Sequence, residues 1–213
     1  MKKNTTFWLV IAAALALGVY VIFNLLTPKI TPGTPGAVTD NDWIKGDKNS
    51  SVVLIEYSDF QCPACKSIWG VMDRITNEYG NKIVFAYRYF PLKQIHPNAV
   101  VSARAAEAAG RQGKFWEMHD VLFNYQNDWS SDIDPYNKFE KYAADLGLDT
   151  EKFKDDYNSG SVKDVVESGY NAAMDLKLEG TPTLFLNGKE LKARSLQGIK
   201  DAIDEALKPA PQA

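Results

Sequence analysis

Two cysteines, Cys62 and Cys65, are the side chains of this sequence best suited to chemistry, and they are the only cysteines among its 213 residues. Pro63 and Ala64 separate them. At this spacing one pair of thiols can open and close a disulfide reversibly, with a thiolate as the attacking group. The motif therefore predicts thiol–disulfide exchange.

The segments around the motif predict a strand that leads into a helix. Residues 52–57 form an apolar run, and the apolar residues between 66 and 78 recur at helical spacing. Pro63 fits the first helical turn, so Cys62 falls at the cap and faces the unpaired N–H groups of that turn. Because the helix dipole favours an anion there, we expect Cys62 to be the acidic, exposed nucleophile. Cys65, one turn further along, is expected to be the shielded resolving thiol.

Other uses of the two cysteines compete with exchange. A zinc site needs two more ligands, and the two histidines, His96 and His119, lack the spacing of a zinc finger. A purely structural disulfide would close too short a loop to stabilise the fold much. Two inert thiols in a reducing compartment are a further alternative, which depends on where the chain resides.

The remaining elements are predicted from periodicity and turn residues. The order is β-α-β, a helical insertion over about residues 97–178, then β-β-α. A right-handed crossover makes the first two strands parallel, and Asn187-Gly188 is typical of a tight hairpin turn. We expect strands at residues 52–57, 83–89, 183–186 and 189–191, and helices at residues 66–78, 99–109, 115–125, 136–146, 162–178 and 195–207.

Residues 1–26 predict a membrane segment. Lys2 and Lys3 precede an uncharged run over residues 7–26, which has about the 20 residues that cross a bilayer as a helix. The A-x-A-like sequence at residues 14–16 lies in the middle of that run, so an uncleaved anchor is favoured over a cleaved signal. The lysines favour a cytoplasmic amino end, which would leave the catalytic domain outside the cytoplasm. A cleaved signal would instead give a secreted or periplasmic domain.

Three regions are expected after this segment. Residues 27–42 are too rich in Pro, Gly and Thr to form a core and predict a linker. Residues 43–208 have the composition and length of one globular domain, and residues 209–213 are expected to form a disordered tail. The net charge of −3 argues against a nucleic-acid partner. We expect a monomer.

The globular part of the sequence resembles the DsbA-like thiol–disulfide oxidoreductases over roughly residues 43–207. The resemblance implies a thioredoxin-like α/β fold with the helical insertion between its β-α-β and β-β-α halves. The residues that carry it are Glu56-Tyr57-Ser58-Asp59-Phe60-Gln61-Cys62-Pro63-Ala64-Cys65, His96-Pro97, the stretch 112–119, and Gly180-Thr181-Pro182-Thr183.

The resemblance also implies a role for Pro182. In thioredoxin-like proteins the proline at this position is cis and lies against the active-site disulfide. A cis bond would leave the backbone of Thr181 free to pair with an extended substrate peptide beside Cys62. The alternative is a trans proline that only begins an edge strand.

Two more side chains are candidates for the site. The family places a buried acid at the position of Glu56, where burial would raise the pKa of the carboxyl and let it relay a proton to or from Cys65. The alternative is a solvated carboxylate on the outward face of the strand. Phe60, beside the motif, is expected to belong to an apolar surface that faces unfolded substrates. His96 and His119 are expected to be packed or hydrogen-bonded structural residues.

These features predict an enzyme that introduces disulfides into reduced, unfolded exported proteins without a cofactor or metal. The resemblance implies that a quinone-linked membrane partner reoxidises it. Pro63-Ala64 leaves the direction open, because Ala64 offers neither a charge nor a side-chain hydrogen bond and departs from the Pro-His of the strongest oxidants in the family. A reductase or isomerase of the same fold is one alternative. A tethered metal-binding protein that uses Cys62, Cys65 and a histidine is another.

Overall fold

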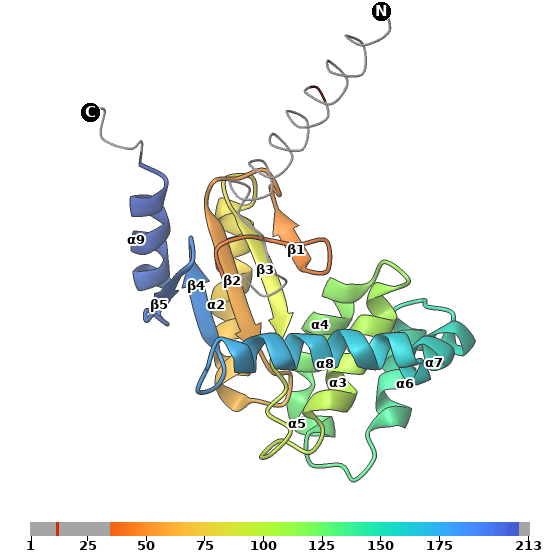
Figure 1. Ribbon diagram of the computed structural model, residues 1–213. Coiled ribbons are helices and arrows are strands. Elements are labelled where there is room, and N and C mark those ends of the chain that lie inside the picture. The colour runs from red at the N-terminus through yellow and green to blue at the C-terminus, as the bar shows by residue number, and fades with distance from the viewer. Residues whose placement is uncertain (1–11, 13–34, 209–213) are drawn as a thin grey trace, which may run out of the picture. The chain divides into compact units, whose positions relative to one another are not determined.

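One mixed β-sheet forms the centre of the protein. The computed structural model describes residues 35–208 and, before them, Ala12. In this part of the chain the strand order is β1-β3-β2-β4-β5 (Figure 1). β2 and β3 are parallel, as predicted, and the β4–β5 hairpin is antiparallel to β2. The strands are β1 (Trp43–Gly46), β2 (Val53–Ser58), β3 (Val84–Tyr89), β4 (Thr183–Leu186) and β5 (Lys189–Leu191).

Helices cover both faces of this sheet. α2 (Pro63–Tyr79) and α9 (Leu196–Ala206) pack on one face, and α8 (Gly160–Asp175) packs on the other (Figure 1). The side chains of β2 alternate between the faces, as a pleated strand requires. Leu54 packs with α2 and α9, whereas Ile55 and Tyr57 pack on the side of α8. Glu56 therefore belongs to the face that carries α2.

The insertion between β3 and α8 consists of short helices gathered beside one end of the sheet (Figure 1). The predicted helices are present, but the last of them spans Gly160–Asp175 rather than 162–178. The helices that precede α8 are α3 (Ala99–Gly110), α4 (Phe115–Asn124), α5 (Gln126–Trp129), α6 (Tyr136–Asp145) and α7 (Thr150–Asn158).

Three elements, β1, α5 and α7, were not predicted from the sequence. α5 and β1 have four residues each, too few to show a periodic pattern. α7 is mostly polar, and only Phe153 and Tyr157, four residues apart, mark its buried side. Asp149 caps this helix by accepting a hydrogen bond from the backbone N–H of Lys152 at 3.0 Å.

β1 joins the sheet to the insertion through Trp43. Its indole ring stacks on Phe115 with 4.5 Å between ring centroids, and its Nε1–H donates to Glu107 at 2.9 Å. Gly110 of α3 lies directly against the same ring. A Cβ at this position would come within 2.4 Å of the indole, so only glycine fits. The two halves of the domain are therefore in van der Waals contact at this edge.

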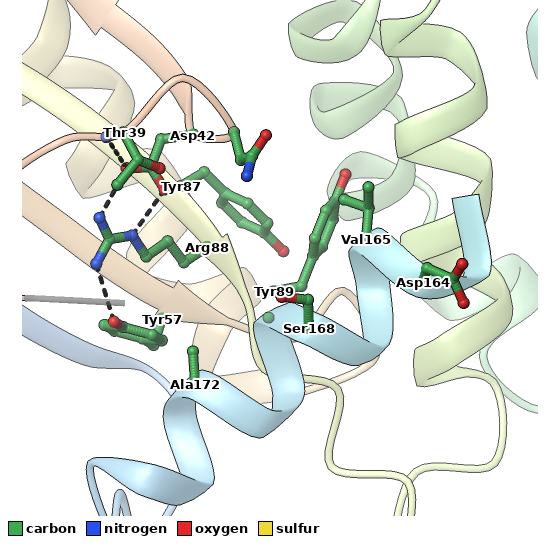
Figure 2. Close-up of a pocket in the computed structure, with 12 residues that line it drawn as sticks. Thr39, Asp42, Tyr57, Tyr87, Arg88, Tyr89, Asp164, Val165, Ser168 and Ala172 are labelled. Carbon is green, nitrogen blue, oxygen red and sulfur yellow. Dashed lines mark hydrogen bonds and ion pairs between the residues drawn. The ribbon is translucent and has the colours of Figure 1, made fainter. Parts of the chain in front are cut away.

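Residues that precede β1 also pack against the sheet. Arg88 of β3 forms a buried ion pair with Asp42 at 2.7 Å and donates to the carbonyl oxygen of Ala37 at 2.7 Å and to the Tyr57 hydroxyl at 3.0 Å. Figure 2 shows the guanidinium between Asp42 and Tyr57. Both Arg88 and residues of α8 line a cavity of about 240 Å³. The last part of the predicted linker, residues 37–42, therefore lies against the domain.

The structure does not describe the predicted transmembrane helix, and none of the helices that it does describe could cross a membrane. A membrane span needs about 20 apolar residues, and no helix among residues 35–208 combines that length with that apolar character. The longest of them, α2, has 17 residues and includes Lys66, Asp73 and Arg74. The predicted run 7–26, Ala12 apart, lies outside the described residues. The finding contradicts the location drawn from it, a membrane-anchored or secreted domain, and that location is not carried further.

Candidate active site

The backbone places Cys62 at the amino end of α2. Cys62 is the N-cap residue, in an extended conformation with φ −71° and ψ 123°, and Pro63 is the first helical residue, as predicted. The backbone N–H of Cys62 donates to the carbonyl oxygen of Asp59, and its own carbonyl accepts the N–H of Lys66, both at 3.1 Å. Cys62 and Cys65 are free thiols. The helix thus begins with a sulfur atom at its positive end.

Hydrogen bonds lower the pKa of the Cys62 thiol to about 5. The largest cause is the hydrogen bond from the Cys65 thiol, and burial opposes the shift. The interaction with Thr181 lowers the pKa further, and the backbone N–H groups of Cys65 and Ala64 make smaller contributions. The predicted acidity is thus present, but the predicted exposure is wrong. Only 6% of Cys62 is exposed, and its sulfur lies 3.5 Å from the carbonyl oxygen of Thr181.

The second thiol has the opposite character. Cys65 is fully buried, and burial raises the pKa of its thiol, as do the hydrogen bond to Cys62 and the nearby charges of Cys62 and Glu56. At neutral pH the pair therefore holds one proton between a thiolate at Cys62 and a thiol at Cys65. This asymmetry matches the predicted division into an attacking and a resolving sulfur.

Glu56 lies in β2 on the same face of the sheet and is buried, so the alternative of a solvated carboxylate is wrong. Burial raises the pKa of its carboxyl to about 7, and the nearby Ser58 hydroxyl and Arg194 oppose the shift. The charges of Glu56 and Cys65 both raise the pKa of the buried Tyr87 hydroxyl, although burial contributes most. Glu56 is thus an acid that exchanges protons near neutral pH within electrostatic reach of Cys65.

The Thr181–Pro182 peptide bond is cis, as the resemblance implied. It precedes β4, which pairs with both β2 and β5, so the alternative of a trans proline at an edge strand is wrong. Thr183 Oγ1 donates to the carbonyl oxygen of Gly180 at 2.7 Å, and Arg194 donates to that of Pro182 at 3.2 Å. These bonds hold the turn against Cys62.

Phe60 does not face substrate in this structure. It is buried, stacked on Tyr87 with 5.1 Å between ring centroids, and packed against Phe123 and His119. The prediction failed because the helical insertion closes over this ring.

Three exposed apolar side chains belong to residues adjacent in the sequence to residues that help to hold the segment 59–62. Ile95 is 70% exposed and Tyr125 is 46% exposed, and Ile133 is fully exposed. Each lies next in the sequence to a residue that holds the segment 59–62. Ile95 precedes His96, which binds Asp59, and Tyr125 precedes Gln126, which binds the carbonyl oxygen of Cys62. Ile133 follows Asp132, whose carbonyl oxygen accepts from Asn98, and Asn98 in turn binds Gln61.

The two histidines are held in place by carboxylates. His96 Nδ1 lies 2.6 Å from Asp59 Oδ2, and the same oxygen accepts the backbone N–H of Leu92 at 2.9 Å. His119 is buried among aromatic rings, with Nδ1 2.8 Å from Asp120. In the part of the chain that the structure describes, no three His, Cys, Asp or Glu residues are grouped so that they could hold a metal ion. The structural role expected for both histidines is confirmed, and the metal-binding alternative has no ligand set here.

Sequence reasoning missed the polar side chains that join the motif to the insertion. These are Gln61, beside the motif, and Gln126 and Asn98, in the insertion. All three are buried, and their hydrogen bonds connect the two segments. The only signal for Gln126 is an amide within an aromatic stretch, Phe123-Asn124-Tyr125-Gln126-Asn127-Asp128-Trp129. Such a signal locates a buried polar residue without naming its partner.

Comparisons with known proteins agree with this architecture. A family model described as Thioredoxin matches residues 38–205. Among curated proteins, the Na(+)/H(+) antiporter NhaA 1 of Mycolicibacterium gilvum is 36% identical over 191 residues, which are 84% of this chain and 29% of that relative. The chain thus spans less than a third of the length of this curated relative.

Several solved structures share the fold. BdbD from Bacillus subtilis superposes with a TM-score of 0.73 at 20% identity, over 83% of this chain and 98% of that one. Wolbachia pipientis alpha-DsbA1 gives 0.72 at 20% identity, over 83% and 96%. MdbA, a thiol-disulfide oxidoreductase from Corynebacterium diphtheriae, gives 0.64 at 23% identity, over 84% and 96%. The expected DsbA-like fold is confirmed, and the chain belongs to the thioredoxin family.

Proposed function

We propose that this protein is a thiol–disulfide oxidoreductase that introduces disulfides into reduced, unfolded proteins. The observation that carries the proposal is the opposite environment of the two sulfurs, with the pKa of Cys62 lowered to about 5 and that of Cys65 raised. A stabilised thiolate at Cys62 favours the reduced form of the pair, so the oxidised pair tends to take electrons from other thiols.

In the first step a thiolate of the client protein attacks the sulfur of Cys62 in the oxidised pair. A bond forms between the client sulfur and Cys62, and the bond between Cys62 and Cys65 breaks. Cys65 leaves as a thiolate in a buried site that raises the pKa of its thiol, so it takes up a proton. Glu56, with a pKa of about 7, is the buried acid that supplies it.

In the second step another client thiolate attacks the client sulfur of the mixed disulfide. The client disulfide forms and Cys62 leaves as a thiolate, which is a good leaving group because its pKa is about 5. Two electrons have then passed from the client dithiol to the Cys62–Cys65 pair. A further turnover needs an oxidant, for which the family resemblance suggests a quinone-linked partner.

The substrate class follows from the surface beside the site. Unfolded clients expose apolar side chains, and Ile95, Tyr125 and Ile133, whose sequence neighbours help to hold the segment that carries Cys62, offer exposed apolar contacts. The backbone of Thr181 lies beside the Cys62 sulfur, where an extended client segment could pair with it. These contacts do not select one sequence, which suits a broad range of clients.

The test is the redox equilibrium of the Cys62–Cys65 pair with glutathione, followed by oxidation of a reduced, unfolded protein whose native disulfides are known. We expect a potential well above that of thioredoxin, about −270 mV, and towards that of the strong oxidant DsbA, about −120 mV. We also expect stoichiometric transfer of the disulfide to the client. A potential at or below that of thioredoxin would instead assign the pair to reduction.

A further inference from the structure

Two glutamines form a reciprocal contact between the motif and the helical insertion. Gln126, the first residue of α5, donates through Nε2 to the carbonyl oxygens of Phe60 at 2.7 Å and Cys62 at 3.0 Å. Gln61, which lies between those two residues, donates through Nε2 to the carbonyl oxygen of Ser130 at 2.7 Å. Each glutamine thus binds the backbone of the segment that carries the other.

Asn98 completes this contact from the start of α3. Its backbone N–H donates to Gln61 Oε1 at 2.6 Å, and its side-chain amide donates to the carbonyl oxygen of Asp132 at 2.8 Å. All three amide side chains are buried, with 3% of Gln126 exposed. Buried amides with this many partners are fixed in orientation, since each lost hydrogen bond would leave a polar atom without water.

We propose that Gln126 is a positioning residue of the redox site, whose amide fixes the backbone on both sides of Gln61 so that the Cys62 sulfur faces the amino end of α2. The proposal rests on the function proposed above only for its consequence in catalysis. The geometry applies to the dithiol itself, whichever way the electrons flow.

Three observations carry this assignment. Cys62 is the N-cap residue of α2 but makes no side-chain capping hydrogen bond, so the position of its sulfur depends on its backbone together with the contacts to Cys65 and Thr181. Within residues 35–208, Gln126 is the only donor to the Phe60 carbonyl, and it supplements Lys66 at the Cys62 carbonyl. The N–H groups of Ala64 and Cys65 contribute to the low pKa of Cys62, and they do so only while the sulfur points at them.

The test replaces Gln126 by methionine, which keeps the length of the side chain but removes the amide. We expect the pKa of Cys62, measured on the reduced protein by the ultraviolet absorbance of the thiolate, to rise by about one unit, a tenfold change. The same factor lowers the redox potential by about 30 mV. Gln126→Asn, with an amide one methylene short, should give a smaller rise.

Gln112→Ala is the matched control. Gln112 also clasps a backbone, donating to the carbonyl oxygen of Asp149 and accepting its N–H, both at 3.0 Å, but this contact lies within the insertion. We expect the control to lower the thermal stability and to leave the pKa of Cys62 unchanged.

Two outcomes would overturn the assignment. One is a pKa of Cys62 in folded Gln126→Met equal to that of the unmodified protein; if that variant does not fold, an unchanged pKa in Gln126→Asn has the same meaning. The other is an equal rise in Gln112→Ala, which would mean that any loosening of the insertion reaches Cys62. Because the readout needs no client, failure of the proposed oxidase activity would leave this result intact.

Discussion

The sheet half of the protein and its helical insertion have cores of different composition. Between the sheet and helices α2 and α9 the buried side chains are mostly aliphatic, namely Val52, Leu54, Ile68, Met72, Ile75, Ile83, Leu184, Ile199 and Ile203, with Tyr79 and Phe85. The insertion is built from alanines of α3 and large rings, among them Phe115, Phe123, Trp129, Phe139 and Phe153. The small alanines allow close approach of helices, and the rings fill the remaining space.

This difference corresponds to a difference in how each half serves the site. The sheet half carries the two sulfurs, Glu56 and the cis turn at Pro182 on its own strands, helix start and turn. The insertion supplies polar side chains that hold that backbone, such as the buried Gln126. The comparison teaches that reactivity can be encoded locally while its fine adjustment comes from a distant part of the sequence.

The largest effect is expected from the sulfurs themselves. Cys62→Ser removes the attacked atom and should reduce disulfide transfer to background. Cys65→Ser keeps Cys62 but lacks the resolving thiol. With a client whose single cysteine carries a thionitrobenzoate mixed disulfide, the Cys62 thiolate should displace thionitrobenzoate, and the covalent complex with the client should accumulate. Non-reducing gel electrophoresis detects both results, with a reduced, unfolded client for Cys62→Ser and the activated client for Cys65→Ser. Transfer by Cys62→Ser at the unmodified rate would contradict the assignment of chemistry to the sheet half.

A large change in stability is expected from the core of the insertion. Trp129 is fully buried and donates through its indole N–H to the carbonyl oxygen of Leu122 at 2.9 Å. Trp129→Ala should lower the free energy of unfolding by about 3–5 kcal/mol. Denaturant unfolding followed by two probes, one for each half, would show whether both halves unfold together. A separate transition for the insertion would divide the domain into two cooperative units.

Glu56→Gln should change the free energy of unfolding by less than Trp129→Ala, and it should raise that free energy rather than lower it. The pKa of Glu56 is about 7 in the folded protein against an ordinary value of 4.5, so the folded state binds more protons between these values. Ionisation of this carboxyl therefore does not affect the free energy of unfolding below pH 4.5. It lowers that free energy increasingly between pH 4.5 and 7, and by a constant amount above pH 7. At pH 8 the variant should be more stable by about 3 kcal/mol. Urea unfolding of both proteins at pH 4 and pH 8 measures the difference.

The same substitution also tests the proton supply. The neutral amide that replaces the acid in Glu56→Gln cannot protonate Cys65, so transfer should slow near pH 7 although the protein is more stable. Equal rates at all pH values would remove Glu56 from the mechanism and leave only its electrostatic effect.

The smallest effect is expected at the exposed apolar side chains beside the motif. Ile133 is fully exposed, so Ile133→Ser should not change stability by more than about 0.5 kcal/mol. It should weaken binding of an unfolded client by a few-fold, because one apolar contact with the client is lost. A factor of ten in affinity corresponds to about 1.4 kcal/mol. The measurement is KM and kcat for client oxidation, determined separately. Met174, 48% exposed on α8, provides the control Met174→Ser, for which KM should not change.

Much of the fold was predictable because its signals are local. The run into Cys62, the proline after it and the Asn187-Gly188 turn each specify their own conformation, and both turn residues have positive φ as expected. Burial of Phe60 and the role of Gln126 were not predictable in this way. Both depend on which residues of the insertion meet the motif in space, and no periodicity in the sequence records that contact.

The Arg88 ion pair shows that the packed domain includes residues that precede β1. A chain cut between Asp42 and Trp43 would keep every strand and helix of residues 43–208, yet it would leave a guanidinium buried without its carboxylate. Removing one partner of such a pair costs about 3–5 kcal/mol, which is a large part of the stability of a typical domain. Residues 37–42 thus act as a structural part of the domain, although their composition is that of a spacer.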